Sequence, residues 1–529
     1  MTDPVYRLPP RRTGTALYGL TLAQLALAGT GLAGLAAATT LLPGRAGLLA
    51  GTATLATAVL LATVRVAGQP LHHLLPLLIR HALTRDRHRP TTAAGAARPA
   101  GSPRWLRGLD LLDAPTGQLP TTDGNPPMLI HHRRTGALTV VLDVRGGPFT
   151  LLDPADQHRH LAAWARLLAQ TARDRSTLTF GWTLRTHHAP PPPLTPTSAT
   201  RPHRAGSTRG AAGDAGQTPL ASYRHLLADT LLQHHDLRLW ITVNSHHARG
   251  RRPELAALDA AHALITRATT AGLTVHGALS TAQLSAEITA HTDPHRPSHP
   301  ADGGPARTPN APTRLPAGLA ARAGLPGARD TPVPPAPEPP TFPTSSTSPA
   351  SADAPSAEIE ARWDAARVGA TWHRVFHIAA WPTSPLHPGW LDPLLHETPT
   401  ARTLTVAYTP IPPPTSRRRL NHDTAALDLA LQIRHRHGVR IPTHLTDARD
   451  DIDQRDAELS AGHPELAYTA LLDLASPDRQ ALDTATADLV DLAARAGITD
   501  LHPLHGRHQH ALPAALPLGL TPRRPHPAT

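Results

Sequence analysis

The sequence has 529 residues, a formal charge of +11, 58 prolines and only 3% aromatic residues. All of its basic residues are Arg, which excludes an ordinary P-loop ATPase and a protein kinase, because both need a Lys at the nucleotide phosphates. It has no Cys, so disulfides, thiolate zinc sites and Cys nucleophiles are also excluded. The Arg-, Ala-, Gly- and Pro-rich composition is typical of GC-rich coding. The alternative is a basic surface that meets nucleic acid or anionic lipid.

Two long uncharged segments near the start, residues 16–42 and 46–64, predict membrane spans. About twenty apolar residues are enough to cross a bilayer. The sequence Pro43-Gly44-Arg45 between them predicts a tight turn. Small residues that would let two helices approach closely are Gly29, Gly31, Gly34 and Gly51. We therefore predict a transmembrane helical hairpin. A cleaved signal peptide is disfavoured because the first run is too long and a second span follows at once.

Arginines flank this hairpin on its two open ends. Arg7, Arg11 and Arg12 precede the first run, and Arg65 and Arg80 follow the second, whereas the turn carries only Arg45. Positive charge favours the cytoplasmic side. The pattern predicts a two-pass protein of the cell (cytoplasmic) membrane with both termini in the cytoplasm. The apolar stretch at 71–83, with His and Arg beside it, predicts an interfacial helix on the lipid bilayer.

Composition divides the chain into six parts, since Pro-, Gly- and Ser-rich stretches cannot bury enough apolar surface to order themselves. These parts are the membrane hairpin and interfacial helix (1–83), a linker (84–104), a first α+β module (105–291) with a disordered insertion (187–218), a Pro-rich linker (292–356), a second α+β module (357–511) and a flexible tail (512–529).

Both modules alternate predicted strands and helices. In the first we expect strands at 138–144, 178–184, 237–243 and 273–276, and helices from the N-cap Asp153 and at 223–233, 254–270 and 279–291. In the second we expect strands at 372–381, 402–410, 466–474 and 498–501, and helices at 416–436, 447–459 and from Asp478 to 496. This β-α-β-like order predicts two ferredoxin-like α+β sandwich modules joined by the disordered Pro-rich linkers.

The candidate catalytic and metal-binding patterns are weak. The sequence has no HExxH, no GxSxG and no GxGxxG after a strand. Its best metal candidates, His502, His505, His508 and His510, have no convincing carboxylate or Cys partner in the sequence. Five acidic residues at 450–458 are spaced as a solvated helix face. We therefore predict no catalytic residue, no cofactor and no metal, and a protein that is not an enzyme.

One basic triplet, Arg417, Arg418 and Arg419, opens a predicted helix after three prolines. It is a candidate contact for an acidic partner or nucleic acid, and the alternative is a solvated helix start. Four tryptophans, Trp363, Trp372, Trp381 and Trp390, recur in one region and predict core and interface positions.

The chain resembles a group of actinobacterial conjugation-associated membrane proteins with a PrgI-like N-terminal hairpin. The resemblance lies in residues 4–14, the two spans, residues 65–71, the stretch 466–474 with its following helix, and the Pro-rich close at 512–520. It implies a non-catalytic inner-membrane scaffold of a type IV secretion-like or conjugative DNA-transfer apparatus that docks an ATPase or a neighbouring subunit.

Two other functions stay open. One is a membrane subunit of a type VII secretion system (EccE-like), which has a similar layout. The other is a membrane-tethered metal-dependent hydrolase that uses the C-terminal histidines. Direct DNA contact and homo-oligomer formation also stay open.

Overall fold

The computed structural model describes residues 15–17, 20–42, 44–66, 69–84, 106–189, 232–244, 252–294 and 359–521, with small gaps inside the longer ranges. The predicted linkers at 84–104 and 292–356, the insertion at 187–218 and the helix at 223–233 lie almost entirely outside these residues. At their edges, residues 187–189 and 232–233 belong to strands, and 292 ends a helix.

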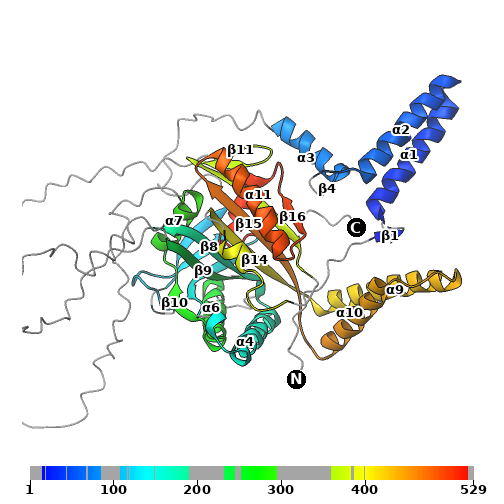
Figure 1. Cartoon of the computed structure of the whole chain (residues 1–529). Helices are drawn as coiled ribbons and strands as arrows, with labels where there is room; N and C mark the ends of the chain where they lie inside the picture. The colour runs from blue at the N-terminus through cyan, green and yellow to red at the C-terminus, as the bar shows by residue number, and fades with distance from the viewer. Residues whose placement is uncertain are drawn as a thin grey trace, which may run out of the picture. The chain divides into compact units, whose positions relative to one another are not determined.

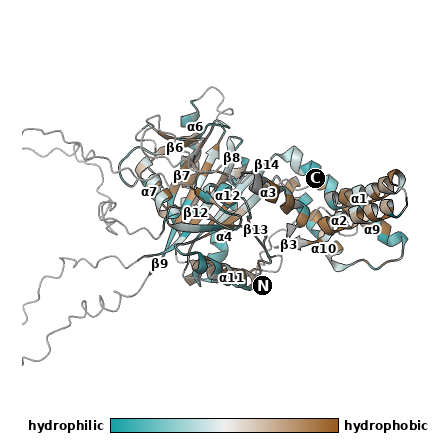
Figure 2. Cartoon of the chain, turned by 90° about the horizontal axis from the view of Figure 1, so that it is seen from above, coloured by the Kyte–Doolittle hydropathy of each residue, from teal (hydrophilic) through white to brown (hydrophobic). Residues whose placement is uncertain are grey.

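The two predicted spans are helices, α1 (Leu22–Leu41) and α2 (Arg45–Thr63). Windows within them are long and apolar enough to cross a membrane. Figure 2 shows brown, apolar residues around both helices. The first helix starts later than expected, because residues before it form two very short strands, β1 (Thr15–Leu17) and β2 (Leu20–Thr21). A second pair of short strands, β3 (Arg65–Val66) and β4 (Gln69–Pro70), leads from α2 into α3 (Leu71–Thr84).

The rest of the described chain is a mixed α/β body built on one antiparallel sheet of twelve strands (Figure 1). The strands of its first half are β5 (Leu109–Asp113), β6 (Met128–His132), β7 (Ala137–Arg145), β8 (Thr177–Ala189), β9 (Leu232–Val243) and β10 (Thr274–Ala278). Those of its second half are β11 (Ile359–Ala361), β12 (Ala366–Val368), β13 (Thr371–Ala380), β14 (Ala401–Ile411), β15 (Glu465–Ser476) and β16 (Asp500–Pro503).

The helices of the body fall between these strands. They are the short η3 (Phe149–Leu151), α4 (Pro154–Arg173), α6 (Pro253–Thr270), α7 (Thr281–Thr292), α8 (Asp392–His396), α9 (Pro413–Arg436), α10 (Thr443–Ser460), α11 (Arg479–Arg495) and α12 (His508–Ala515). Asp153 occupies the predicted N-cap of α4, and the Asp478 carboxylate caps α11 by accepting the Ala481 N–H at 2.8 Å.

The same strand order occurs in both halves of the sheet. In the first half β10 and β9 flank β7, and β8 lies beyond β9. In the second half β16 and β15 flank β13, and β14 lies beyond β15. Each half also has a short hairpin strand, β6 or β12, on the edge of its first long strand. The two halves therefore repeat one arrangement of strands.

The two halves join along β8 and β14. These strands pair through residues 180–186 and 402–408, with Thr183 opposite Thr405 at the centre. The Thr405 hydroxyl donates to the Thr183 hydroxyl at 3.1 Å. The sequence predicted two separate sandwiches, but the pairing merges them into one sheet. It also covers two long strand edges that would otherwise expose unpaired backbone groups.

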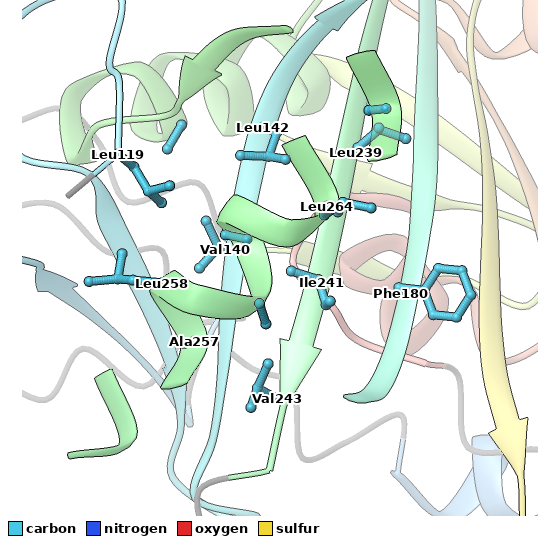
Figure 3. Close-up of a cluster of buried hydrophobic side chains, with 14 of the residues drawn as sticks. Leu119, Val140, Leu142, Phe180, Leu239, Ile241, Val243, Ala257, Leu258 and Leu264 are labelled. Carbon is cyan, nitrogen blue, oxygen red and sulfur yellow. The ribbon is translucent and has the colours of Figure 1, made fainter. Parts of the chain in front are cut away.

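One face of the sheet is covered by α4, α6 and α11. Alternate residues of each strand point to this face, and Figure 3 shows Val140, Ile241 and Phe180 near Leu258 and Leu264 of α6. A matching cluster in the second half packs α11 against β13, β14 and β15. Gly181 of β8 leaves room for the Trp240 side chain, because a Cβ at this position would lie 2.6 Å from the indole ring.

The opposite face is covered by α7, α12 and the segment that follows α12. Leu284 and Ile288 of α7 pack with Trp240 and with Leu516 and Leu518. Gly519, at a φ of +68°, fits where a side chain would meet the hydroxyls of Thr139 and Thr242. The predicted flexible tail from residue 512 therefore differs from the structure up to residue 520. The segment is ordered because the apolar residues between its prolines pack on the sheet.

Most of the predicted elements are confirmed in type, with ends within a few residues. β8 and β9 extend well beyond the predicted strands, since they pair with each other as far as Ala189 and Leu232. The prediction omitted β5, β6, β11, β12, α8 and α12.

Candidate functional site

Close helix packing holds the N-terminal hairpin together. A Cβ at Gly31 would lie 2.6 Å from the Ala58 Cβ, and one at Gly51 would lie 3.1 Å from the Leu35 backbone. The Gln24 amide donates to the Ala62 carbonyl at 2.8 Å across the two helices. Three of the four predicted small residues, Gly31, Gly34 and Gly51, are thus contact positions, whereas a Cβ at Gly29 would meet no atom of the other helix within 4 Å.

An engineered disulfide is expected to form across this hairpin. An ideal Cβ at Gly34 lies 3.7 Å from the Thr54 Cβ, which is within the usual Cβ–Cβ range of disulfides. The chain has no other Cys, so Gly34→Cys with Thr54→Cys should give an intramolecular crosslink on mild oxidation. Mass spectrometry and maleimide gel shifts would measure it. The matched pair Gly29→Cys with Thr54→Cys should stay reduced, and equal crosslinking of both pairs would contradict the packing.

The arginines predicted to set membrane topology are only partly within the described chain. Arg7, Arg11 and Arg12 lie outside it. Arg65 lies in β3, and Arg80 lies in α3. α3 itself exposes Leu75, Leu78 and Ile79, which share one side of the helix at i, i+3 and i+4 spacing. This apolar face is consistent with the predicted interfacial helix.

A buried network of charges ties α7 to the first half of the sheet. Arg238 donates to Asp143 at 2.7 Å and to Glu287 of α7 at 2.9 Å. Burial by itself lowers the pKa of Arg238, but Glu287 and Asp143 outweigh it and raise the pKa. Next to it, Arg185 donates to Asp236 at 2.6 Å. The sequence prediction missed this network. A charge inside an apolar strand, such as Asp143, was the available signal, since buried charges need partners.

The C-terminal end of α7 makes a second buried network with the other half. His373 Nδ1 lies 2.8 Å from the Asp473 carboxylate, and its Nε2 lies 3.0 Å from the Thr292 carbonyl. Two acceptors therefore face the two ring nitrogens, which favours the imidazolium. Burial by itself lowers the pKa of His373, but Asp473 and Thr292 outweigh it and raise the pKa. Burial lowers the pKa of His291, which lies 3.7 Å from Asp473.

These two networks fit a structural role better than a chemical one. The side chains of His373 and Asp473 are 0% and 2% exposed, and those of Arg238 and Glu287 are 10% and 8% exposed. A substrate has no direct access to such groups. Because α7 reaches residues of both halves, the networks connect the halves across their β8–β14 joint.

The C-terminal histidines have different surroundings, although the rings of His505 and His508 meet edge to face with centres 6.2 Å apart. His502 pairs with Asp500 at 2.6 Å, and His505 stacks on Trp363 with ring centres 5.7 Å apart. His508 is buried, and its Nδ1 accepts the Val375 N–H at 3.1 Å. Burial, with His505 and Arg374 nearby, lowers the pKa of His508 to about 3. Within the part of the chain that the structure describes, no three His, Cys, Asp or Glu residues come together as a metal site.

The four predicted core tryptophans are buried or half-buried. Trp381 and Trp390 meet edge to face, with ring centres 5.6 Å apart. Three guanidinium groups, those of Arg362, Arg367 and Arg479, lie within 5.4 Å of the Trp372 ring. The burial of these tryptophans agrees with the predicted core positions.

The α9–α10 helical hairpin is inserted between β14 and β15 and extends past their ends (Figure 1). Arg417, Arg418 and Arg419 are exposed in the early turns of α9. Arg417 lies 4.0 Å from Asp456 of α10, and Arg449 lies 2.5 Å from Asp428 of α9. The acidic residues at 450–458 are exposed, as the sequence predicted. This hairpin is the most prominent charged projection of the described body, and it is a candidate docking surface.

Neither a protein-family model nor a curated protein matches the chain.

Proposed function

We propose that this protein is a two-pass protein of the cytoplasmic membrane and a non-catalytic scaffold of a type IV secretion-like or conjugative DNA-transfer apparatus. The observation that carries the proposal is the α1–α2 hairpin. Its helices have 20 and 19 residues, pack through glycines and are apolar enough to span. The flanking arginines support cytoplasmic termini. The resemblance to conjugation-associated membrane proteins supports the kind of apparatus.

In this proposal the body consists of two ferredoxin-like modules that share one sheet. The strand order supports them: numbered along the chain, the four main strands of each half follow the order 4-1-3-2. A body with two fused modules presents a broad, rigid surface to neighbouring subunits. Arg417, Arg418 and Arg419 are its proposed contact with an acidic surface of a conjugation-type ATPase or another secretion subunit.

A detergent pull-down from the native host tests this function. The tagged full chain is expected to recover a conjugation-type ATPase from the membrane fraction. Changing Arg417, Arg418 and Arg419 to Gln should reduce that recovery about ten-fold or more, since interface charge pairs are worth 1–3 kcal/mol when partly desolvated. Arg159→Gln, on an exposed arginine of α4, is the matched control.

Other recoveries would redirect the proposal. Recovery of type VII secretion components would favour the alternative membrane subunit. Recovery of the same partners by the triple variant and by the unchanged chain would remove the arginine triplet from the interface.

A further inference from the structure

Exposed apolar side chains of the body are concentrated at the far end of the α9–α10 hairpin. Leu429, Ile433 and Val439 are 57%, 45% and 52% exposed. The other exposed large apolar residues of the described body lie on three separate elements and are Leu112, Leu151 and Val490. Single exposed apolar residues are ordinary, but a group of them marks a surface that becomes covered. We call residues 429–446 the hairpin tip.

α10 cannot cover these side chains, because α9 packs on α10 through a different side. Leu420 and Leu427 are buried, and Leu431, one turn beyond Leu427, is half-buried. Leu429 and Ile433 are also one turn apart, and they lie on the opposite side of the helix. α9 therefore has one apolar stripe toward α10 and a second one toward solvent.

The charge of the hairpin tip has one sign. It contains Arg434, Arg436 and Arg440 and no Asp or Glu. Within the described chain none of these three arginines forms an ion pair, whereas residues outside the tip pair across the hairpin. The acidic residues of α10 begin at Asp447, just after the tip. Exposed aliphatic side chains surrounded by unpaired arginines are typical of peptides that bind an anionic bilayer surface.

We propose that the hairpin tip lies on an anionic bilayer surface. Leu429, Ile433 and Val439 enter the boundary between headgroups and acyl chains, while Arg434, Arg436 and Arg440 meet lipid phosphates. The inference rests on the proposed function in one respect, since the α1–α2 anchor keeps the chain beside a bilayer. The hairpin, residues 413–460, has no Phe, Tyr or Trp, the large rings on which bases stack most strongly, which favours lipid over single-stranded nucleic acid.

A fluorescent label in the full chain tests the proposal. Val439→Cys is labelled with an environment-sensitive nitrobenzoxadiazole dye, and the protein is reconstituted in phosphatidylcholine vesicles with or without phosphatidylglycerol. We expect a blue shift and quenching by brominated lipid only with phosphatidylglycerol, and a loss of both at high salt. Ile433→Cys should respond in the same way. A label at Ala457→Cys, exposed on α10, should not respond.

Charge variants measure how much the arginines strengthen membrane insertion of the hairpin tip. Changing Arg436 and Arg440 to Gln should weaken insertion of the tip about 25-fold, or about five-fold for each arginine. Changing Arg133 and Arg159, two exposed arginines of the body, to Gln should leave insertion unchanged.

Three outcomes would overturn the proposal. They are no response in either vesicle, a response that depends on protein density and not on lipid charge, and a response that needs added DNA. The second would indicate a second copy of the chain, and the third would indicate nucleic acid. A separate measurement tests whether α1 and α2 span the membrane. If they do not, alkaline carbonate should release the chain from the vesicles. The tip can still be tested in that case by adding vesicles to the released chain.

Discussion

Acidification is expected to destabilise the protein, and His508 should be one of the largest contributors. Its side chain is buried, and its pKa is lowered to about 3, whereas an unfolded His has a pKa of about 6.5. Between these values the unfolded chain binds a proton that the folded chain does not. The stabilisation is therefore complete above about pH 6.5 and is lost as the pH falls, by about 1.4 kcal/mol per pH unit. By pH 4 the loss should reach about 3 kcal/mol.

The test is urea denaturation of the detergent-solubilised chain at pH 7, 5.5 and 4, followed by tryptophan fluorescence. In His508→Asn the Asn carbonyl can still accept the Val375 N–H, but nothing titrates. The variant should lose stability less steeply, by about 1.4 kcal/mol per pH unit. His463→Asn, at an exposed position after α10, is the control. Parallel curves for the unchanged chain and His508→Asn would show that His508 does not carry the effect.

Other histidines should add to the same loss. Burial lowers the pKa of His132 and of His187 to about 4. His373 acts in the opposite direction, because a raised pKa gives stabilisation that is complete below about pH 6.5 and is lost as the pH rises. The stability of the protein is therefore expected to have its maximum near neutral pH.

Arg238→Ala should lower the free energy of unfolding by about 3–5 kcal/mol. The change removes the guanidinium that the carboxylates of Asp143 and Glu287, 4% and 8% exposed, share, and leaves Glu287 only the longer contact with Arg185 at 3.7 Å. Urea denaturation at pH 7 measures the loss. Arg133→Ala removes an ion pair whose arginine is 59% exposed, so it should lower the free energy of unfolding far less than Arg238→Ala does.

A triple variant separates the charge network from simple packing. Replacing Arg238 by Met and both Asp143 and Glu287 by Leu removes all three charges together. Apolar replacements of whole buried ion groups are often close to neutral, so this variant should regain most of the stability that Arg238→Ala loses. If both variants were equally unstable, the loss would come from packing and not from unpaired charge.

Local pattern in the sequence was enough to predict most elements of this fold. The apolar runs of α1 and α2 and the alternation at the start of β8 are visible without any tertiary contact, because side-chain periodicity follows from backbone geometry. β11 and β12 were missed because three residues are too few to show a period. The burial of His508 was also not predictable from local pattern. Sequence places His502, His505, His508 and His510 close together, but only the fold buries His508 and stacks His505 on Trp363.

The sequence by itself determined the two long apolar helices, the alternating strands and helices of the body, and the charged helices α9 and α10. Only the tertiary structure decided how the halves meet. Thr183 and Thr405 lie 222 residues apart, and no local pattern specifies which strand edges pair. The same holds for the segment around Leu516, whose Pro-rich sequence shows no helix or strand pattern and was predicted as a flexible tail. It is ordered because the sheet presents Trp240 and Val141 for it to cover, and burial of apolar area is a property of both surfaces together.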